Sequence, residues 1–138
     1  LEINSGCLPK VYAGNRACST CIYYLVTPES FSALHKLPTD EIWHFYLGDP
    51  LEQLQLYPDG NGKMILLGQD IAHGENPQVV VPAGAWQGTR LKDGGSFALV
   101  GTTMAPGFEF EDFELAPEKD ILFKFETFKE EIKNFFKR

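Results

Sequence analysis

HKLPTDEIWHFYLGDP at residues 35–50, together with NPQVVVPAGAWQ at 76–87, is the part of this sequence that decides its fold. The first stretch places a His, a Glu and a strand-ending Gly in order. The second is a short valine strand, a Pro-x-Gly turn and then the polar residue Gln87. Both stretches place polar side chains beside a strand and a turn, and they contain the candidate site residues.

Short β-rich runs recur on both sides of these stretches, each closed by Gly, Pro, Asp or Asn. Strands at this spacing, with turn residues between them, predict a β-sandwich or barrel. No long helical pattern separates the runs, so parallel βαβ units are not expected. The predicted strands are 20–27, 31–37, 41–47, 51–57, 63–68, 78–81, 85–91, 96–104 and 110–115.

The last 20 or so residues change from strand to helix character. Large apolar residues recur there at steps of three and four, with Lys and Glu between them, which predicts an amphipathic helix or two short ones. Pro117 is a suitable first helical residue. We expect the apolar side chains to pack against the outside of the barrel, with a partner interface as the alternative; they are Ile121, Phe125, Phe128, Ile132 and Phe135.

The 138 residues suit one domain with one core. A net charge of −7 and a pI of about 4.9 exclude nucleic acid as a partner, because phosphate binding needs a basic face. The charge also disfavours anionic membrane surfaces, and no apolar run approaches the ~18–20 residues that span a bilayer. The opening LEINSG lacks the pattern of a signal peptide.

Three cysteines, Cys7, Cys18 and Cys21, do not form a disulfide framework by count, so a cytoplasmic protein is predicted. Cys18 and Cys21 form a C-x-x-C, but no second pair of zinc ligands accompanies it. The motif leads into a strand, whereas a redox C-x-x-C begins a helix. We expect these cysteines to be packing residues.

His35 and Glu41 are the candidate chemical groups of the first stretch. Strand alternation puts Glu41 on one face with Trp43 and Phe45, and His44 on the other face. His35 and Glu41 could therefore meet in one cavity, which His44 could not join. They would be either an acid/base pair or a satisfied polar pair inside the barrel.

The second stretch offers Gln87 as a hydrogen-bonding residue and Trp86 as a stacking residue, depending on which of them faces inward. Near the end of the β region, carboxylates alternate with phenylalanines, as on a solvated strand face, so no calcium site is expected there. The predicted ligand-binding set is His35, Glu41, Trp43, Gln78, Trp86 and Gln87.

The chain resembles the cupin superfamily, and within it the fifth cupin family, a domain of unknown function. The resemblance lies in STCIYYLV at 19–26, FSALHKLPTDEIWHFYLGDPLEQL at 31–54, NPQVVVPAGAWQ at 76–87 and FALVGTTMAPGFEFEDFELA at 97–116. It implies an all-β cupin domain over 1–138: a double-stranded β-helix, or jelly-roll barrel, over about 11–116, and a short helical C-terminus over about 117–138. It also implies a homodimer and a break in the helical segment near 125–127.

Compared with the cupin metal motifs, the chain keeps His35 and Glu41 but has Ala33 and Gln87 at two histidine positions. One imidazole, one carboxylate and one amide make a poor transition-metal site. No metal or other cofactor is therefore predicted, with His35, Glu41 and Gln87 as the residues of a weak site if one exists. The opening also departs from the family: residues 2–6 replace a His-Pro-Glu-Gly-Gly run, and Pro9 replaces an Arg.

Three alternative functions are compatible with these residues and with the resemblance. The first is binding of a small molecule in the barrel, without demonstrated catalysis. The second is a metal-independent sugar-nucleotide epimerase, which the resemblance implies because the same superfamily includes metal-free deoxysugar epimerases. His35 would then be the base, steadied by Glu41, and Tyr23 or Tyr24 the acid. Arg16, Lys36 and Arg90 would have to bind the diphosphate. The third is a structural or storage-like dimer, and the fold alone does not choose among them.

Overall fold

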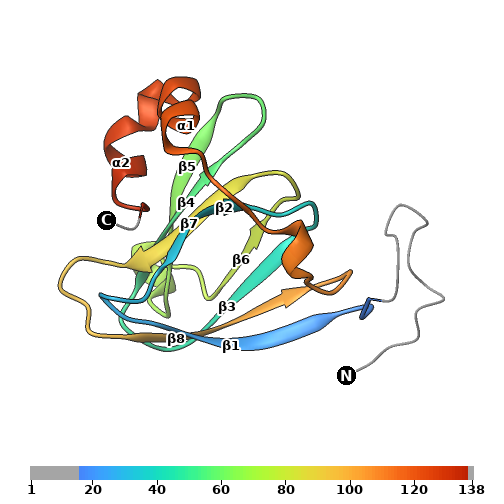
Figure 1. The fold of residues 1–138 in the computed structure, drawn as a ribbon. Coiled ribbons are helices and arrows are strands. Elements are labelled where there is room, and N and C mark those ends of the chain that lie inside the picture. The colour runs from blue at the N-terminus through green and yellow to red at the C-terminus, as the bar shows by residue number, and fades with distance from the viewer. Residues whose placement is uncertain (1–15, 137–138) are drawn as a thin grey trace.

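A computed structural model of the chain describes residues 16–136, which form a β-barrel of two antiparallel sheets with helices on one side (Figure 1). One sheet has four strands in the order β1-β8-β3-β6, and the other has five in the order β5-β4-β7-β2-β9. The all-β jelly-roll prediction is confirmed. In chain order the strands are β1 Thr20–Val26, β2 Ser32–Lys36, β3 Glu41–Gly48, β4 Leu51–Leu56, β5 Gly62–Leu67, β6 Gln78–Val81, β7 Trp86–Leu91, β8 Ala98–Met104 and β9 Glu114–Leu115.

The turns between the strands depend on glycines at positive φ. Gly48 ends β3 with a φ of 105°, and a Cβ there would collide with the backbone oxygen of Phe97. Gly84 closes the Pro82-Ala83-Gly84 turn with a φ of 78°. Side chains other than glycine rarely adopt this region. These turns set where β3 ends and where β7 begins. The stretches 35–50 and 76–87 can therefore contribute side chains to the same barrel interior.

The four-stranded sheet turns one face toward the barrel interior. On β3, Glu41, Trp43 and Phe45 are buried, as the alternation predicted, whereas His44 between them is half-buried on the outer face. The inward apolar residues of both sheets form one core cluster. Its fully buried members include Val26, Trp43, Leu51, Leu67, Ala98 and Val100.

The five-stranded sheet is covered on its outer face by the C-terminal helical segment (Figure 1). This segment consists of α1 Glu118–Lys124, the 3₁₀ turn η4 Glu126–Phe128 and α2 Lys129–Lys133, so the predicted break near 125–127 is confirmed. Helices and sheet form a second core, whose buried members are Leu34, Leu54, Leu56, Trp86, Ile121, Phe125, Ile132 and Phe135.

The outer face of the four-stranded sheet is not covered by any described residue. Outward positions of its strands carry no Asp, Glu, Lys or Arg. Tyr23 is 79% exposed and Tyr46 40% exposed, and their rings contact each other edge to face at 5.8 Å. The residues at these positions are Cys21, Tyr23, Leu25, Ile42, His44, Tyr46, Leu47, Gln78, Val80, Leu99, Gly101 and Thr103.

The segment after β8 differs from its prediction as a strand over 110–115. Only Glu114–Leu115 is a strand, paired with β2, and Phe110–Asp112 is a 3₁₀ turn, η3. Arg16 holds the segment by an ion pair to Asp112 at 2.7 Å, and the backbone N–H of Phe108 donates to the Thr20 hydroxyl at 3.0 Å. These long-range contacts bend residues 105–113 across the end of the barrel. We call residues 105–113 the mouth loop.

A second short 3₁₀ turn, η2, spans Ile71–His73 between β5 and β6. No helix within residues 16–136 is long and apolar enough to cross a membrane. The opening residues that depart from the family pattern, 2–6 and Pro9, and Cys7 lie outside the described residues.

Candidate functional site

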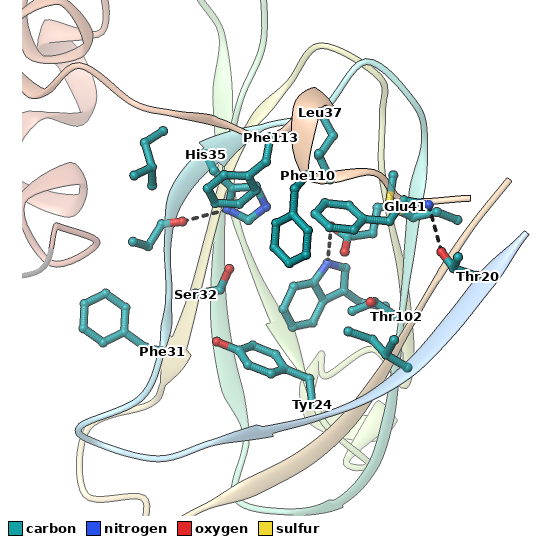
Figure 2. A pocket seen from close by; sticks show the side chains of 16 residues that line it. Thr20, Tyr24, Phe31, Ser32, His35, Leu37, Glu41, Thr102, Phe110 and Phe113 are labelled. Atoms are coloured by element: carbon teal, nitrogen blue, oxygen red, sulfur yellow. Dashed lines mark hydrogen bonds between the residues drawn. The ribbon is translucent and has the colours of Figure 1, made fainter. Parts of the chain in front are cut away.

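A cavity of about 520 Å³ opens at one end of the barrel, between β1, β2, β3, β8 and the mouth loop. Figure 2 shows the side chains that surround it, with His35 and Phe113 at one side and Glu41 at the other. Tyr24 and Ser32 also line this hollow, on the side away from Glu41 and Thr20 (Figure 2). The barrel is therefore open to a small molecule at this end.

Six of the residues that line the cavity carry aromatic rings. Tyr24, Phe31 and Trp43 come from the barrel, and the Tyr24 and Trp43 rings meet edge to face at 6.0 Å. The mouth loop adds the rest: Phe113 stacks on the His35 ring at 4.7 Å, and Phe108 and Phe110 meet edge to face at 5.1 Å. An apolar, aromatic wall of this kind is typical of a ligand site.

The polar base of the cavity is formed by His35 and Glu41, and Gln87 lies buried behind them. Strand pairing places His35 directly opposite Gln87, and the Gln87 side-chain amide lies 3.0 Å from Nε2 of His35. The same amide nitrogen donates to Oε2 of Glu41 at 3.3 Å, and the indole N–H of Trp43 donates to that oxygen at 3.0 Å. The three residues singled out by the two half-motifs thus lie in one environment.

The hydrogen bonds fix where His35 carries its proton. Nδ1 lies 2.8 Å from the backbone oxygen of Ala33, so Nδ1–H donates there and Nε2 accepts from Gln87. Burial lowers the pKa of His35, because it disfavours the imidazolium; the bond to Ala33 opposes this shift. The imidazole is thereby kept as a neutral acceptor.

Burial raises the pKa of Glu41, and this effect exceeds the opposing hydrogen bonds from Trp43 and Thr102. The pKa of Tyr24 is also raised, first by burial and then by the negative charge of Glu41. Each of these groups is shifted toward its neutral form. Burial in the cavity therefore disfavours the charged form of all three groups, so an ionised side chain there gains from a compensating partner.

A chain of hydrogen bonds continues from Gln87 into the barrel. Thr89 donates to Gln87 at 3.1 Å, Gln53 donates to Thr89 at 3.0 Å, and Gln55 donates to Gln53 at 2.8 Å. Tyr57 donates to Gln55 at 2.8 Å and ends the chain. Every bond points toward the cavity, so the chain holds the Gln87 amide with its N–H groups toward His35 and Glu41.

Three residues of the predicted site lie elsewhere, and their assignment is corrected. Tyr23 is on the outer face of β1, because Tyr24 takes the inward position. Trp86 is on the helix side of β7, where it packs in the second core beneath Lys36. Gln78 is exposed on the outer face of β6. The predicted residues that the structure brings together are His35, Glu41, Trp43 and Gln87.

The mouth loop supplies a part of the site that the sequence did not predict. Phe108, Phe110 and Phe113 were assigned to a solvated strand, but they line the cavity. The available signal was Pro106-Gly107, a turn that separates them from β8. Thr102, which hydrogen-bonds Glu41 from β8, was also missed.

His35, Glu41 and Gln87 do not fit a transition metal. The imidazole lone pair that would bind the ion already accepts an N–H from Gln87, and an amide nitrogen is not a metal ligand. One imidazole and one carboxylate remain, fewer than iron or zinc sites use. No group of three or more His, Cys, Asp or Glu among residues 16–136 is arranged to hold a metal ion.

Residues 4–116 match the model of the Cupin superfamily (DUF985). The chain belongs to this family. It is 35% identical over 108 residues to the uncharacterized protein YML079W of Saccharomyces cerevisiae, which covers 75% of this cupin and 53% of that protein. This cupin thus spans about half the length of that curated relative.

Solved structures support the same placement. This cupin is similar to protein SO0799 from Shewanella oneidensis, with a TM-score of 0.83, 32% identity, and 91% and 79% of the two chains covered. A dTDP sugar isomerase from Desulfovibrio desulfuricans G20 has a TM-score of 0.62 at 16% identity, covering 85% and 71%. At that identity the likeness shows the fold alone. The relatives at more than 30% identity are uncharacterised proteins, and none brings a demonstrated catalytic activity to the family.

Proposed function

We propose that this cupin binds a small, largely apolar molecule in the cavity at the end of its barrel. The observation that carries the proposal is the combination of an open cavity of about 520 Å³, walls of aromatic rings, and one polar base. Ligand sites share this make-up: apolar walls bury the ligand, and a few converging polar groups orient it. The His35–Gln87–Glu41 group would be the orienting element.

The cavity weighs against a purely structural role. A barrel that only packs and dimerises has no use for an open hollow, because unfilled space forfeits packing contacts. His35, Glu41 and Gln87 are all buried beside this hollow, at 6%, 7% and 1% exposure. Burial of two ionisable groups is costly unless they serve a purpose.

The epimerase alternative receives less support. It needs cations for the substrate's diphosphate, and no described residue that lines the cavity is a Lys or Arg. The three basic residues that the sequence suggested for this task each have an acidic partner. These are Asp112 for Arg16 at 2.7 Å, Glu114 for Lys36 at 2.9 Å and Glu52 for Arg90 at 2.6 Å.

A thermal-shift screen of small aromatic and aliphatic molecules, amines, alcohols and acids among them, tests the proposal. A ligand that binds only the folded state stabilises it by about 2.7 kcal/mol at a hundredfold excess over Kd. Each hit is then titrated into ¹⁵N-labelled protein. We expect the Trp43 indole N–H signal to move, because this group donates to Glu41 at the cavity.

Two histidine variants on opposite faces provide the control. His35→Ala removes a cavity residue, whereas His44→Ala removes a half-buried residue on the outer face of β3. Binding should weaken in the first variant and stay unchanged in the second. If no hit in the screen perturbs Trp43, or if His35→Ala binds every hit as the wild type does, the proposal is wrong.

We also propose that two copies pair through the outer face of the four-stranded sheet. This face is extensive and exposes Tyr23, Leu25, Tyr46 and Val80 without a single charged side chain. Exposed apolar patches of this kind mark interaction sites. A face without charge offers nothing to a charged partner, and the same face of a second copy matches it.

A cytoplasmic location remains our proposal from the sequence. Cys21 is an exposed thiol on the outer face of β1 and is not in a disulfide. Such a thiol persists in a reducing compartment.

A further inference from the structure

The charge of the cavity points to the class of ligand. Among the described lining residues, Glu41 is the carboxylic acid, and there is no lysine or arginine to balance it. His35 does not supply a positive charge, because its Nε2 accepts the Gln87 amide N–H and its Nδ1–H is donated to Ala33. An ionised Glu41 would therefore face the cavity without a counter-ion from the part of the chain that the structure describes.

The surroundings of Glu41 are unfavourable for an isolated negative charge. The side chain is 7% exposed and is flanked by apolar and aromatic groups. Hydrogen bonds from Trp43 and Gln87 supply neutral dipoles, which offset only part of the lost hydration. A positive charge brought in by a ligand would compensate the carboxylate directly.

The walls suit the same kind of charge. Six aromatic rings line the cavity, and the negative face of an aromatic ring attracts a cation within about 6 Å of its centre. An anionic ligand would meet both the ring faces and Glu41 unfavourably. The six rings are Tyr24, Phe31, Trp43, Phe108, Phe110 and Phe113.

Building on the proposed function, we propose that the ligand is a small organic cation: a molecule whose ammonium group pairs with the Glu41 carboxylate and whose apolar part lies among the aromatic rings. Glu41 sets the position of the charge, and the mouth-loop phenylalanines close over the apolar part. Neutral molecules of the same shape fit the walls but leave the carboxylate uncompensated. Carboxylates of the same shape are repelled.

Three probes with one common ring test this proposal: benzylamine, benzyl alcohol and benzoate. At neutral pH they are a cation, a neutral molecule and an anion. Isothermal titration calorimetry and the Trp43 indole N–H signal measure their affinities for the full chain. We expect benzylamine to bind about tenfold tighter than benzyl alcohol, and benzoate to bind weakest.

Two variants separate charge from shape. Glu41→Gln keeps the size and the acceptor oxygen but removes the charge, so benzylamine should lose about tenfold in affinity while benzyl alcohol changes little. Phe110→Leu keeps an apolar group at the mouth but removes a ring face; Phe110 is 86% exposed, so this variant should fold. Its benzylamine affinity should fall severalfold, whereas Phe123→Leu, 89% exposed on α1, should change nothing.

The outcomes distinguish this inference from the proposed function. If benzyl alcohol or benzoate binds as tightly as benzylamine, or if Glu41→Gln folds and keeps the preference for the amine, the cation inference fails while ligand binding stands. If none of the three probes moves the Trp43 signal at millimolar concentration, the cation inference fails. The screen described above then decides separately whether the cavity binds ligands of another class.

Discussion

Glu41 and His35 lie at the same polar base, yet burial shifts both toward their neutral forms: the pKa of Glu41 rises and that of His35 falls. An ion pair between them would have shifted the two pKa values in the opposite directions. Gln87 explains the difference, because its amide donates to both partners and stands where a direct contact would form. The two groups are therefore not an ion pair: burial disfavours the charged form of each, and the Gln87 amide bridges them.

The first prediction concerns Glu41 and pH. Below the ordinary pKa of 4.5, the carboxyl is protonated in the folded and the unfolded chain. As the pH rises through that value, the unfolded chain ionises first, since the folded pKa is raised. Stability is therefore lost between 4.5 and the folded pKa, and each pKa unit corresponds to about 1.4 kcal/mol.

Glu41→Gln lacks this loss. Chemical denaturation at about pH 4 and about pH 7 should show the free energy of unfolding of the variant, relative to the wild type, moving in the variant's favour at the higher pH. The comparison cancels the other titrating groups. A difference between variant and wild type that does not depend on pH would contradict the assigned burial of Glu41.

The second prediction concerns Gln87. Replacing it with Leu keeps the volume but leaves Glu41, His35 and Thr89 without their shared hydrogen-bond partner. Buried polar groups that lose a partner cost about 1–3 kcal/mol, so the free energy of unfolding should fall by that amount. Gln78→Leu is the matched control, because it changes an exposed glutamine on the four-stranded sheet. The free energy of unfolding should change by no more than about 0.5 kcal/mol. Equal losses in both variants would remove the role given to the amide.

At the scale of elements, turn residues and alternation were sufficient to predict the strands of the barrel. Gly48 and Gly84 adopt positive φ where strands end, and the β-rich runs between such turns all contain a strand. The run 110–115 differs from the others, because only its last two residues form a strand. It alternates like a strand but bends, because Arg16, 96 residues away in sequence, pairs with Asp112. A contact of that sequence separation leaves no local pattern.

Which face of a strand looks inward could not be decided from the sequence. Alternation separates Tyr23 from Tyr24 and Trp86 from Gln87, but it does not say which of each pair lies in the barrel. On β4, alternation places two glutamines on one face and two leucines on the other: Gln53 and Gln55 against Leu54 and Leu56. The glutamine face is the interior one. The leucine face packs against the C-terminal helices and forms the second core outside the barrel. The inward face is settled by what covers the sheet, which is a property of the whole fold.

The third prediction tests that second core. Phe135 is fully buried, and its ring lies over Gly88 of β7, where a Cβ would come within 2.7 Å of it. Phe135→Ala should lower the free energy of unfolding by about 3–5 kcal/mol, because it leaves a cavity between helix and sheet. Phe123→Ala, on the exposed side of α1, should change it by less than about 0.5 kcal/mol. Thermal or urea denaturation measures both, and similar small losses would show that the helices contribute little.

At the scale of the whole molecule, the two sheets are treated differently. The five-stranded sheet is covered by the C-terminal helices (Figure 1), whereas the outward positions of the four-stranded sheet carry no Asp, Glu, Lys or Arg. The cavity opens between them at one end and is independent of that face. Pairing of two copies would therefore cover the exposed sheet without blocking the ligand site.

The fourth prediction is the mass of the particle in solution. Light scattering coupled to size exclusion should give twice the 15.5 kDa of the chain. Val80→Lys places a charge on β6, within the proposed interface, where burial without a partner is costly, and should yield monomers. Phe123→Lys, at an 89% exposed position on α1, is the control and should leave the dimer intact. A wild-type protein that runs as a monomer would refute the pairing.

The mouth loop has an evolutionary consequence. The mouth loop supplies three of the six aromatic rings that line the cavity. Arg16 and Thr20 bind this loop, which lies outside the β-sheets. Substitutions in that segment can reshape the entrance while the hydrogen-bonded frame beneath it keeps its registry. Related proteins with the same barrel are thereby free to diverge in what they admit, and exchanging this one segment between them would transfer the preference.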